Sequence, residues 1–527
     1  MAADRSASAR SGHVLTGMRL CSALLWVVVA LTGCPGSQEV ASTAASHDDP
    51  LDGTNPGTST IPAPRIIVLV SIDTLRADHL GLHGHERFTS PILDDFARQG
   101  FIFDDASSTA PWTLPSHASL LTGLFPDAHG VTSVATSLSE QIPTLASMLA
   151  HAGYATAAVV NSTWLKQTEF GLTREFDRFR MIQEDAARRS PNDWVTDQAI
   201  EWLAAVATGK LFLFMHYYDV HSDYASEPAY ERLFVGPYEG SADGTAWQLT
   251  RANLEDEYVE MCHERFDPTR CTFAGTHGNN VIDRSVERLR FDEDDIRHLE
   301  ELYDAGIRQL DSEIGRLFRF LDESGLARDT LVVVTSDHGE EFMEHGRVDH
   351  FLTTYQEVLR VPLIFRGPGV PAGGRSAAPV SLVDVAPTLL SLAGARIPAT
   401  LEGTDLSPLW RSASATPWEE RLLFGEASGG LTFKLVAGDY FPVYRSVRQG
   451  RFKLVYEAKS GQQWLFDLAT DPGEQVDVST QWPEVAARLA DVLHARLAAA
   501  ESARPAPNPV VLPPEDAERL RALGYLP

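Results

Sequence analysis

Residues 66–74, Ile-Ile-Val-Leu-Val-Ser-Ile-Asp-Thr, decide how the rest of the chain is interpreted. The run from Ile66 to Ile72 is apolar and β-branched apart from Ser71, with no alternating polar face. Strands buried on both sides have this pattern, and they belong to parallel sheets covered by helices. The run therefore predicts a central strand, with Asp73 and Thr74 at its carboxyl end.

Similar runs follow along the chain, separated by segments with helical periodicity. The runs are 157–160, 211–215, 331–334 and 361–365, and the helical segments are 142–151, 193–207 and 297–321. This alternation predicts an α/β fold with a large, mostly parallel sheet between helices. Ligands of such sheets bind beyond the carboxyl ends of the strands.

Acidic residues and histidines follow several of these runs. They are Asp73, then His216, Asp219 and His221, then Asp337 and His338. Oxygen and nitrogen donors of this kind suit a hard or borderline divalent cation. A single aspartate after a strand is commonly a helix cap, an alternative that becomes weaker when several strand ends carry such residues.

The segment Pro111-Trp-Thr-Leu-Pro-Ser-His-Ala-Ser-Leu-Leu-Thr-Gly123 has the signals of a short helix. Pro115 suits the first turn and Gly123 the end, which puts Thr113 at or just before the N-terminus. Helix N-termini favour negative charge, and a hydroxyl held there by a metal can act as a nucleophile. Local sequence leaves a plain helix cap as the competing role of Thr113.

Several blocks, in family order, resemble the sulfatase family of the alkaline phosphatase superfamily. They are Asp73–Asp78, Thr113–Gly123, Tyr303–Asp311, Thr335–Gly339, Val361–Ile364, Asp384–Leu390 and Asp467–Pro472. The resemblance implies an alkaline phosphatase-like α/β sandwich with a large mixed, mostly parallel sheet. It also implies a smaller C-terminal domain with a short antiparallel sheet, and a hydrolase acting on ester bonds.

The resemblance also implies a metal centre. Asp73, Asp337 and His338 match the single-metal ligands of phosphonate-monoesterase-like members. Thr113 falls on the nucleophile position and is the fourth expected ligand. One divalent ion, Ca²⁺, Mn²⁺ or Zn²⁺, is the implied cofactor.

Three histidines match positions around that centre. His221 falls where the family has a substrate-contacting histidine, His350 where it has a proton donor to the leaving group, and His117 where it has an arginine. An alternative assigns Asp219, His221 and His350 to a second zinc site. Their spacing fits that pattern poorly, which favours one metal.

Thr113 also departs from the family pattern. Typical sulfatases oxidise a cysteine or serine in Cys-x-Pro-x-Arg to formylglycine, an aldehyde that threonine cannot give, so no formylglycine is expected. A sulfated threonine has no elimination route, whereas a phosphorylated threonine can be hydrolysed at phosphorus. Phosphate or phosphonate esters are therefore favoured. The alternatives are a sulfuric ester hydrolase proper and a catalytically silent, metal-binding lipoprotein that recognises a polymer.

Residues 1–33 have the features of a bacterial lipoprotein signal peptide. Basic residues precede the apolar run Leu20–Leu31, which is too short to span a membrane. It ends in Leu31-Thr-Gly-Cys34, which resembles a lipobox with Cys34 as the lipidation site. We therefore expect an extracytoplasmic, membrane-anchored protein on the periplasmic or outer-membrane face. Residues 34–64, rich in Ser, Thr, Gly, Ala and Pro, predict a disordered tether.

We expect the catalytic domain at 65–415, with an insertion at about 238–280, and a C-terminal subdomain and tail at 416–527. Residues 445–456 and 464–467 fit two strands of the smaller sheet, and 484–499 fit its helix. In the insertion, Cys262 and Cys271 favour a short-loop disulfide over a Cys/His metal cluster with His263 and His277.

The charge of the chain excludes one class of partner. Its 527 residues carry 44 Lys+Arg against 72 Asp+Glu, a formal charge of −28. Such an acidic surface repels phosphate backbones, so no nucleic-acid partner is expected. A metal and a helix N-terminus can still supply a local positive field, so a small-molecule, glycan or lipid ester fits as substrate. The sequence does not indicate an oligomeric state.

Overall fold

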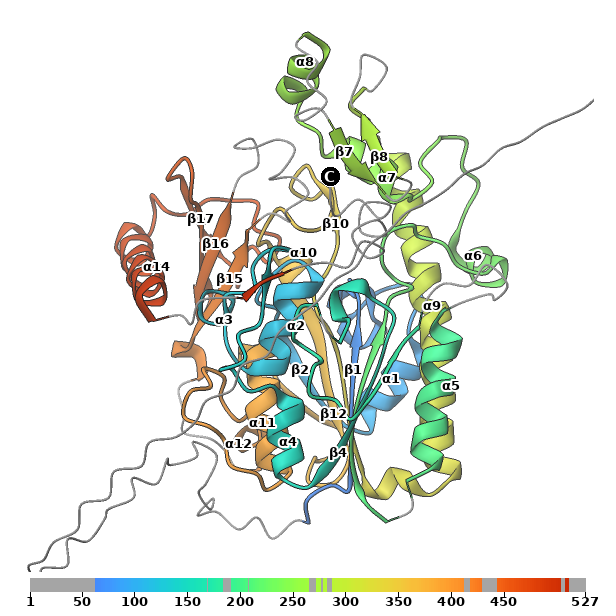
Figure 1. Ribbon diagram of the computed structural model, residues 1–527. Coiled ribbons are helices and arrows are strands. Elements are labelled where there is room, and N and C mark those ends of the chain that lie inside the picture. The colour runs from blue at the N-terminus through green and yellow to red at the C-terminus, as the bar shows by residue number, and fades with distance from the viewer. Residues whose placement is uncertain are drawn as a thin grey trace, which may run out of the picture. The chain divides into compact units, whose positions relative to one another are not determined.

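The structure is a computed structural model whose central feature is a nine-stranded mixed sheet (Figure 1). It describes residues 62–167, 169–182, 191–206, 208–264, 272–275, 278–281, 287–411, 418–428, 443–503 and 508–510. The expected signal peptide and Cys34 lie outside these residues. Within these ranges, no helix combines the length and the apolar character that crossing a membrane requires.

The sheet has the strand order β13-β2-β12-β9-β1-β6-β4-β5, with β14 beside β2. Its strands are β1 (Ile66–Ile72), β2 (Phe101–Ser107), β4 (Tyr154–Val160), β5 (Arg178–Met181), β6 (Lys210–Tyr217), β9 (Thr330–Ser336), β12 (Arg360–Arg366), β13 (Gly374–Ser376) and β14 (Val380–Ser381). Neighbouring strands are parallel, except that β12 is antiparallel to β2 and β9. The predicted mixed, mostly parallel sheet is confirmed, and every predicted run is one of its strands.

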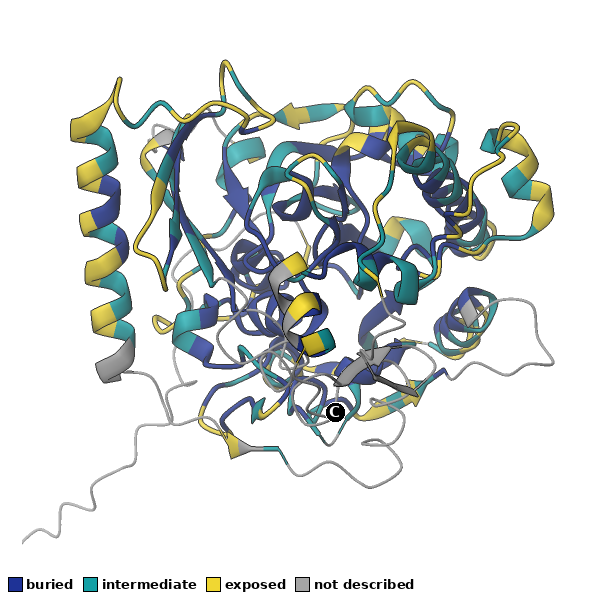
Figure 2. Ribbon diagram, turned by 90° about the horizontal axis from the view of Figure 1, so that it is seen from above, coloured by how far each residue is buried: buried dark blue, intermediate teal, exposed yellow. Residues whose placement is uncertain are grey.

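Helices cover both faces of this sheet (Figure 1). One face carries α1 (Pro91–Arg98), α5 (Pro191–Ala204) and α9 (Glu293–Glu323), and the other carries α2 (Thr113–Thr122), α4 (Leu145–His151) and α11 (Val385–Leu392). Side chains of β1 alternate between the two cores, since Ile67 and Leu69 join the α2 face while Ile66 and Val68 join the α9 face. Figure 2 shows the buried interior in dark blue. Burial on both faces explains why the strand has no polar alternation.

Shorter elements connect these layers. The short strands are β3 (Thr136–Ser137), β10 (Glu341–Phe342), β11 (Val348–Asp349) and β19 (Asn508–Pro509). The short helices are α3 (Pro126–His129), α6 (Pro228–Phe234), α10 (Gln356–Leu359) and α12 (Pro408–Arg411).

The expected insertion contains α7 (Ala246–Ala252), α8 (Asp256–Glu264) and a hairpin of β7 (Thr272–Gly275) and β8 (Gly278–Val281). Cys262 of α8 is buried and disulfide-bonded. Its expected partner, Cys271, lies outside the described residues, as does His277. The pairing of Cys262 with Cys271 therefore stays a prediction.

A second, four-stranded sheet is antiparallel and is covered by α14 (Pro483–Ala503), as the family resemblance implies. Its strands are β15 (Leu422–Ala427), β16 (Tyr444–Gln449), β17 (Phe452–Glu457) and β18 (Gln463–Asp467). The expectation of a single strand over 445–456 is wrong. Gly450, with φ of 57°, turns the chain there and separates β16 from β17. The expected domain boundary near 415 lies outside the described residues.

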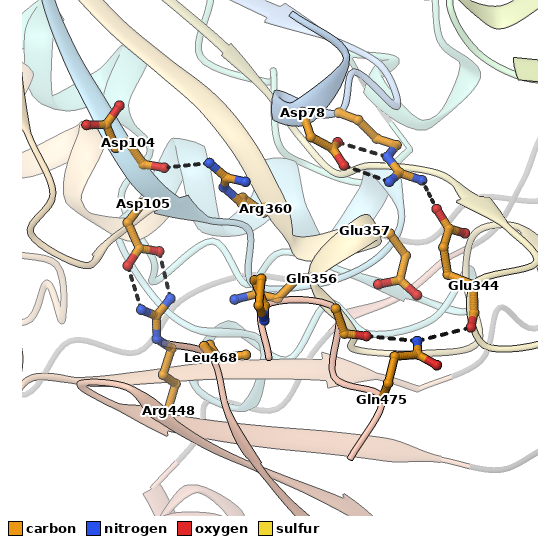
Figure 3. A pocket seen from close by; sticks show the side chains of 13 residues that line it. Asp78, Asp104, Asp105, Glu344, Gln356, Glu357, Arg360, Arg448, Leu468 and Gln475 are labelled. Atoms are coloured by element: carbon orange, nitrogen blue, oxygen red, sulfur yellow. Dashed lines mark hydrogen bonds and ion pairs between the residues drawn. The ribbon is translucent and has the colours of Figure 1, made fainter. Parts of the chain in front are cut away.

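A polar cavity of about 500 Å³ lies between loops of the large sheet and the smaller sheet (Figure 3). Its charged side chains pair with one another across the walls. The Arg448 guanidinium of β16 lies 2.5 and 2.6 Å from the carboxylate oxygens of Asp105 in β2. Arg76 likewise pairs with Asp78 and Glu344. We therefore attribute the cavity to the contact between the two sheets.

His345, beside this cavity, is expected to make the stability of the protein depend on pH. Its Nδ1 lies 2.5 Å from Glu357 Oε1, and its Nε2 lies 3.1 Å from the Glu474 carbonyl oxygen. Burial lowers the pKa of His345, but the bond and charge of Glu357 outweigh burial and raise it. The folded state therefore holds this proton more tightly than the unfolded state. The resulting stabilisation is complete below the unfolded pKa of about 6.5 and is lost as pH rises through the folded pKa.

We expect His345→Gln to lower the free energy of unfolding by about 1–2 kcal/mol at pH 6 and by less at pH 9. Urea denaturation at the two pH values measures both losses. His151→Gln is the matched control, because His151 is exposed and its Nδ1 bonds the nearby Ser147 carbonyl at 2.8 Å. Equal losses at the two pH values would contradict an ionic pair.

Candidate active site

The ends of three adjacent strands bring acidic and histidine side chains together. Asp73 follows β1, Asp337 and His338 follow β9, and β1 lies between β9 and β6. Ligand atoms of Asp73, Asp337 and His338 lie within 4.8 Å of one another, and all three residues are fully buried. The His338 Nε2 lies 3.4 Å from both Asp73 Oδ1 and Asp337 Oδ2. The structure thus brings together the residues that the sequence proposes as metal ligands.

These ligand atoms fit a divalent cation. Asp73 Oδ1, Asp337 Oδ2 and His338 Nε2 are buried and have no hydrogen-bond partner among the described residues. Each such atom costs about 1–3 kcal/mol if nothing pairs with it. Burial lowers the pKa of His338 well below its usual value, so its imidazole is neutral and can donate a lone pair. Two carboxylates and an imidazole suit Ca²⁺, Mn²⁺ or Zn²⁺.

The two carboxylates also require a positive charge. Burial and the neighbouring charge of Asp73 raise the pKa of Asp337 well above its usual range. The physical cause is that two ionised carboxylates repel strongly where water cannot screen them. A cation between them removes that repulsion, so the electrostatics and the unpaired atoms agree.

Thr113 is the first residue of α2, where the sequence predicts the helix to begin. Trp112 is the cap residue, and its side chain bonds no helix amide, so Thr113 is not the cap. The Thr113 hydroxyl is buried and lies 3.5 Å from Asp73 Oδ2. One turn on, Ser116 Oγ donates a 2.6 Å bond to the Asp337 carbonyl. The start of α2 is thereby fixed against the metal ligands.

His117 lies directly behind Thr113. Its Nδ1 donates to the Thr113 carbonyl at 2.8 Å, which leaves Nε2 to accept from Ser71 Oγ at 2.9 Å. Burial lowers the pKa of His117 to about 3, so the ring is neutral. Both ring nitrogens are hydrogen-bonded within the fold, and the bond to the Thr113 carbonyl makes His117 a positioning residue for Thr113.

His221 and His350 lie together beside His338. The ring centroids are 4.8 Å apart for His221 and His350, and 4.5 Å apart for His350 and His338. The His350 Nδ1 lies 2.8 Å from Asp349 Oδ1 and 3.1 Å from Glu340 Oε1. Burial lowers the pKa of His350, but these two carboxylates outweigh burial and raise it well above its usual value. A protonated His350 suits the donation of a proton to a leaving group.

Asp219 does not join this group. Its Oδ2 accepts the backbone N–H of Asn192 in α5 at 3.3 Å. Among the described residues, Asp219 belongs to none of the His, Cys, Asp and Glu groups that are spaced closely enough to hold a metal ion. The geometry therefore gives no support to a second zinc site built on Asp219, His221 and His350.

Asn161 and Glu340 escape the sequence-based prediction: Asn161 follows β4 and contacts His216, and Glu340 supports His350. The sequence names His216 only as one of several donors after a strand, and the structure places it next to the end of β6, with its Nε2 3.3 Å from Asp73 Oδ2. The signal that could have assigned a role to His216 is the register of the parallel strands. His216 pairs with Ser71 in the parallel ladder, so it faces the same side as Ser71 and Asp73.

Comparison with known proteins identifies the family. The family model described as "Sulfatase" matches residues 65–395. The chain belongs to the sulfatase family. A second model, "N-sulphoglucosamine sulphohydrolase, C-terminal", matches residues 343–502 of this sulfatase-family chain. Members of the family are hydrolases that act on ester bonds and use a divalent metal. The buried Asp and His side chains form a group that could hold such an ion.

Similar relatives carry sulfatase names, and a solved structure has the same fold. Mouse "Arylsulfatase K" is 26% identical, with 80% of this chain and 77% of the relative covered. The "N-acetylglucosamine-6-O-sulfatase" of Bacteroides thetaiotaomicron is 25% identical, with 80% and 84% covered. The phosphonate monoester hydrolase of Agrobacterium radiobacter has the same fold, with a TM-score of 0.64 at 21% identity over 83% of this chain and 95% of that chain.

Proposed function

We propose that this sulfatase-family hydrolase uses Thr113 as its nucleophile on a phosphate- or phosphonate-type ester. The observation that carries the proposal is the buried Thr113 hydroxyl, 3.5 Å from Asp73 and beside unpaired metal-ligand atoms. Threonine cannot become formylglycine, and only a phosphorus ester of threonine has a ready hydrolytic route. The lipobox at Cys34 supports a membrane-anchored location outside the cytoplasm, where glycan or lipid esters are accessible.

The side chains then act in two in-line displacements. A divalent ion held by Asp73, Asp337 and His338 would supply Lewis-acid stabilisation of the developing charge. In the first step the Thr113 oxygen bonds to phosphorus, its proton leaves toward Asp73 Oδ2, and the departing oxygen takes a proton from His350 or His221. In the second step water bonds to phosphorus and gives a proton to that histidine, while the Thr113 oxygen leaves phosphorus and recovers its proton from Asp73 Oδ2.

A sulfuric ester hydrolase is the second candidate. It is favoured by the curated relatives, which are named as sulfatases, among them one for N-acetylglucosamine-6-O-sulfate. A catalytically silent, polymer-binding lipoprotein is the weaker alternative, because hydroxyl, metal ligands and both histidines are all retained in one buried cluster.

A substrate panel separates these functions. The purified chain is assayed with p-nitrophenyl phosphate, a phosphate diester, a phosphonate ester and p-nitrophenyl sulfate, each with Mn²⁺, Zn²⁺ and Ca²⁺. We expect kcat/KM for a phosphorus ester to exceed that for the sulfate by about 100-fold or more. Faster turnover of the sulfate would overturn the preference for phosphorus. Absence of turnover on every ester, together with tight metal and glycan binding, would favour the silent lipoprotein.

A further inference from the structure

The two carboxylate oxygens of Asp73 have different surroundings. Among the described residues Oδ1 has no hydrogen-bond partner, and it lies 3.4 Å from His338 Nε2, on the side of the metal ligands. Oδ2 lies 3.5 Å from the Thr113 hydroxyl and 3.3 Å from His216 Nε2. Oδ1 is therefore available to a cation, whereas Oδ2 accepts from the Thr113 hydroxyl and faces the His216 imidazole.

His216 is held rigidly against this second oxygen. The ladder between β1 and β6 pairs Ser71 with His216, and it continues with a 2.8 Å bond from the Asp73 amide to the Tyr217 carbonyl. At the other side of the ring, Nδ1 lies 3.2 Å from the terminal amide of Asn161. The Nδ2 of that amide has no other partner among the described residues, and when it donates to Nδ1, the Nε2–H of His216 is left to face Asp73 Oδ2. The imidazole is fully buried, and within the described part of the chain its Nε2 has no hydrogen-bond partner, so its 3.3 Å approach to Asp73 Oδ2 is a charge contact. Asp73 is thus the polar group that this nitrogen faces.

We propose that His216, held by Asn161, is a positioning residue that fixes the Asp73 carboxylate with Oδ1 toward the metal and Oδ2 toward Thr113. A ligating carboxylate whose second oxygen is held cannot rotate to chelate the ion through both oxygens. That restraint keeps Oδ2 facing the Thr113 hydroxyl, where it orients the nucleophile. The inference rests on the proposed metal centre and adds to it a residue outside the ligand set.

A second cation bound by His117, His216 and Asp337 is the competing explanation, because their ligand atoms also lie within 4.8 Å of one another. The hydrogen bonds of His117 argue against it. Its Nδ1 faces the Thr113 carbonyl and its Nε2 faces Ser71 Oγ, so neither nitrogen has a lone pair to offer a cation without breaking a bond of the fold. His216 is then left with Asp73 as its partner.

The consequence is a measurable loss of metal affinity. Partners that hold a metal ligand in place are typically worth about 10–100-fold in affinity. We expect that loss in His216→Gln, and a smaller loss in Asn161→Ala, which keeps the imidazole but removes its support. At saturating metal, kcat should still fall in His216→Gln, because the oxygen facing Thr113 is no longer oriented.

The test is titration calorimetry of the full chain with Mn²⁺, Zn²⁺ and Ca²⁺, together with Co²⁺ absorption spectra. His129→Gln is the matched control, since His129 is equally buried but bonds Ser119 and the Val131 amide. Weaker binding and a shifted Co²⁺ spectrum in His216→Gln, with a wild-type response in His129→Gln, support the inference. Affinity within twofold of wild type in His216→Gln, or an equal loss in His129→Gln, overturns it and leaves the metal centre standing. A wild-type chain that binds none of the four ions overturns the metal centre as well.

Discussion

Thr113→Ala is expected to lower kcat/KM by about 10⁴-fold or more while the metal stays bound. Removing the attacking atom of a covalent mechanism commonly has an effect of this size, because the remaining groups only bind and stabilise the substrate. Asp73, Asp337 and His338 are untouched by the change, so metal affinity should stay within about tenfold of wild type. Steady-state kinetics and calorimetry on the same sample measure the two quantities.

Thr113→Ser is the matched control, because it keeps the hydroxyl and removes one methyl group. Its kcat/KM should remain within about 100-fold of wild type, well above that of Thr113→Ala. Mass spectrometry of wild type quenched during turnover should show the mass of a phosphorylated chain that Thr113→Ala lacks. Wild-type turnover in Thr113→Ala would remove the nucleophile from the proposal, and equal losses in both variants would assign Thr113 a packing role.

The sequence predicts those parts of the fold that depend on local patterns. The short, largely β-branched run Ile66–Ile72 indicates a buried strand, and the long apolar period of α9 indicates an amphipathic helix. β2 escapes prediction because Asp104 and Asp105 interrupt its apolar run, and these carboxylates face the polar cavity between the sheets. Their burial pattern depends on an element far away in the sequence, so local periodicity cannot reveal it.

The candidate site shows the same division. Asp73, Asp337 and His338 could be predicted because each directly follows an identifiable strand. His216 also lies next to the end of a strand, but its role depends on the β1–β6 register, which places it level with Ser71. Glu340 depends on how the loop after β9 folds back, since its amide bonds the Glu357 carbonyl at 3.1 Å. Strand register and the path of a loop depend on tertiary structure, so the roles of His216 and Glu340 cannot be assigned from their neighbours in sequence.

Asp337→Asn is expected to abolish the stabilisation of the protein by a divalent metal ion. Outer partners alone contribute about 10–100-fold to metal affinity, so loss of a ligating carboxylate should cost at least about 100-fold. In wild type, a divalent ion at 100 times its Kd should stabilise the fold by about 2.7 kcal/mol, and a chelator should remove that gain together with turnover. Thermal unfolding with and without Mn²⁺, Zn²⁺ or Ca²⁺ measures the response.

Without metal, we expect the stability of Asp337→Asn relative to wild type to change in the opposite direction. Without a cation, Asp73 and Asp337 repel each other in a site that excludes water, and burial together with the charge of Asp73 raises the pKa of Asp337. Asp337→Asn removes that repulsion, so the metal-free variant should be at least as stable as metal-free wild type. Asp219→Asn is the control, because Asp219 follows the same sheet edge but bonds the Asn192 amide, and it should keep the full metal response. A variant Asp337→Asn that gains wild-type stability from metal would show that the ion binds elsewhere, whereas loss of the response in Asp219→Asn would restore the two-metal alternative.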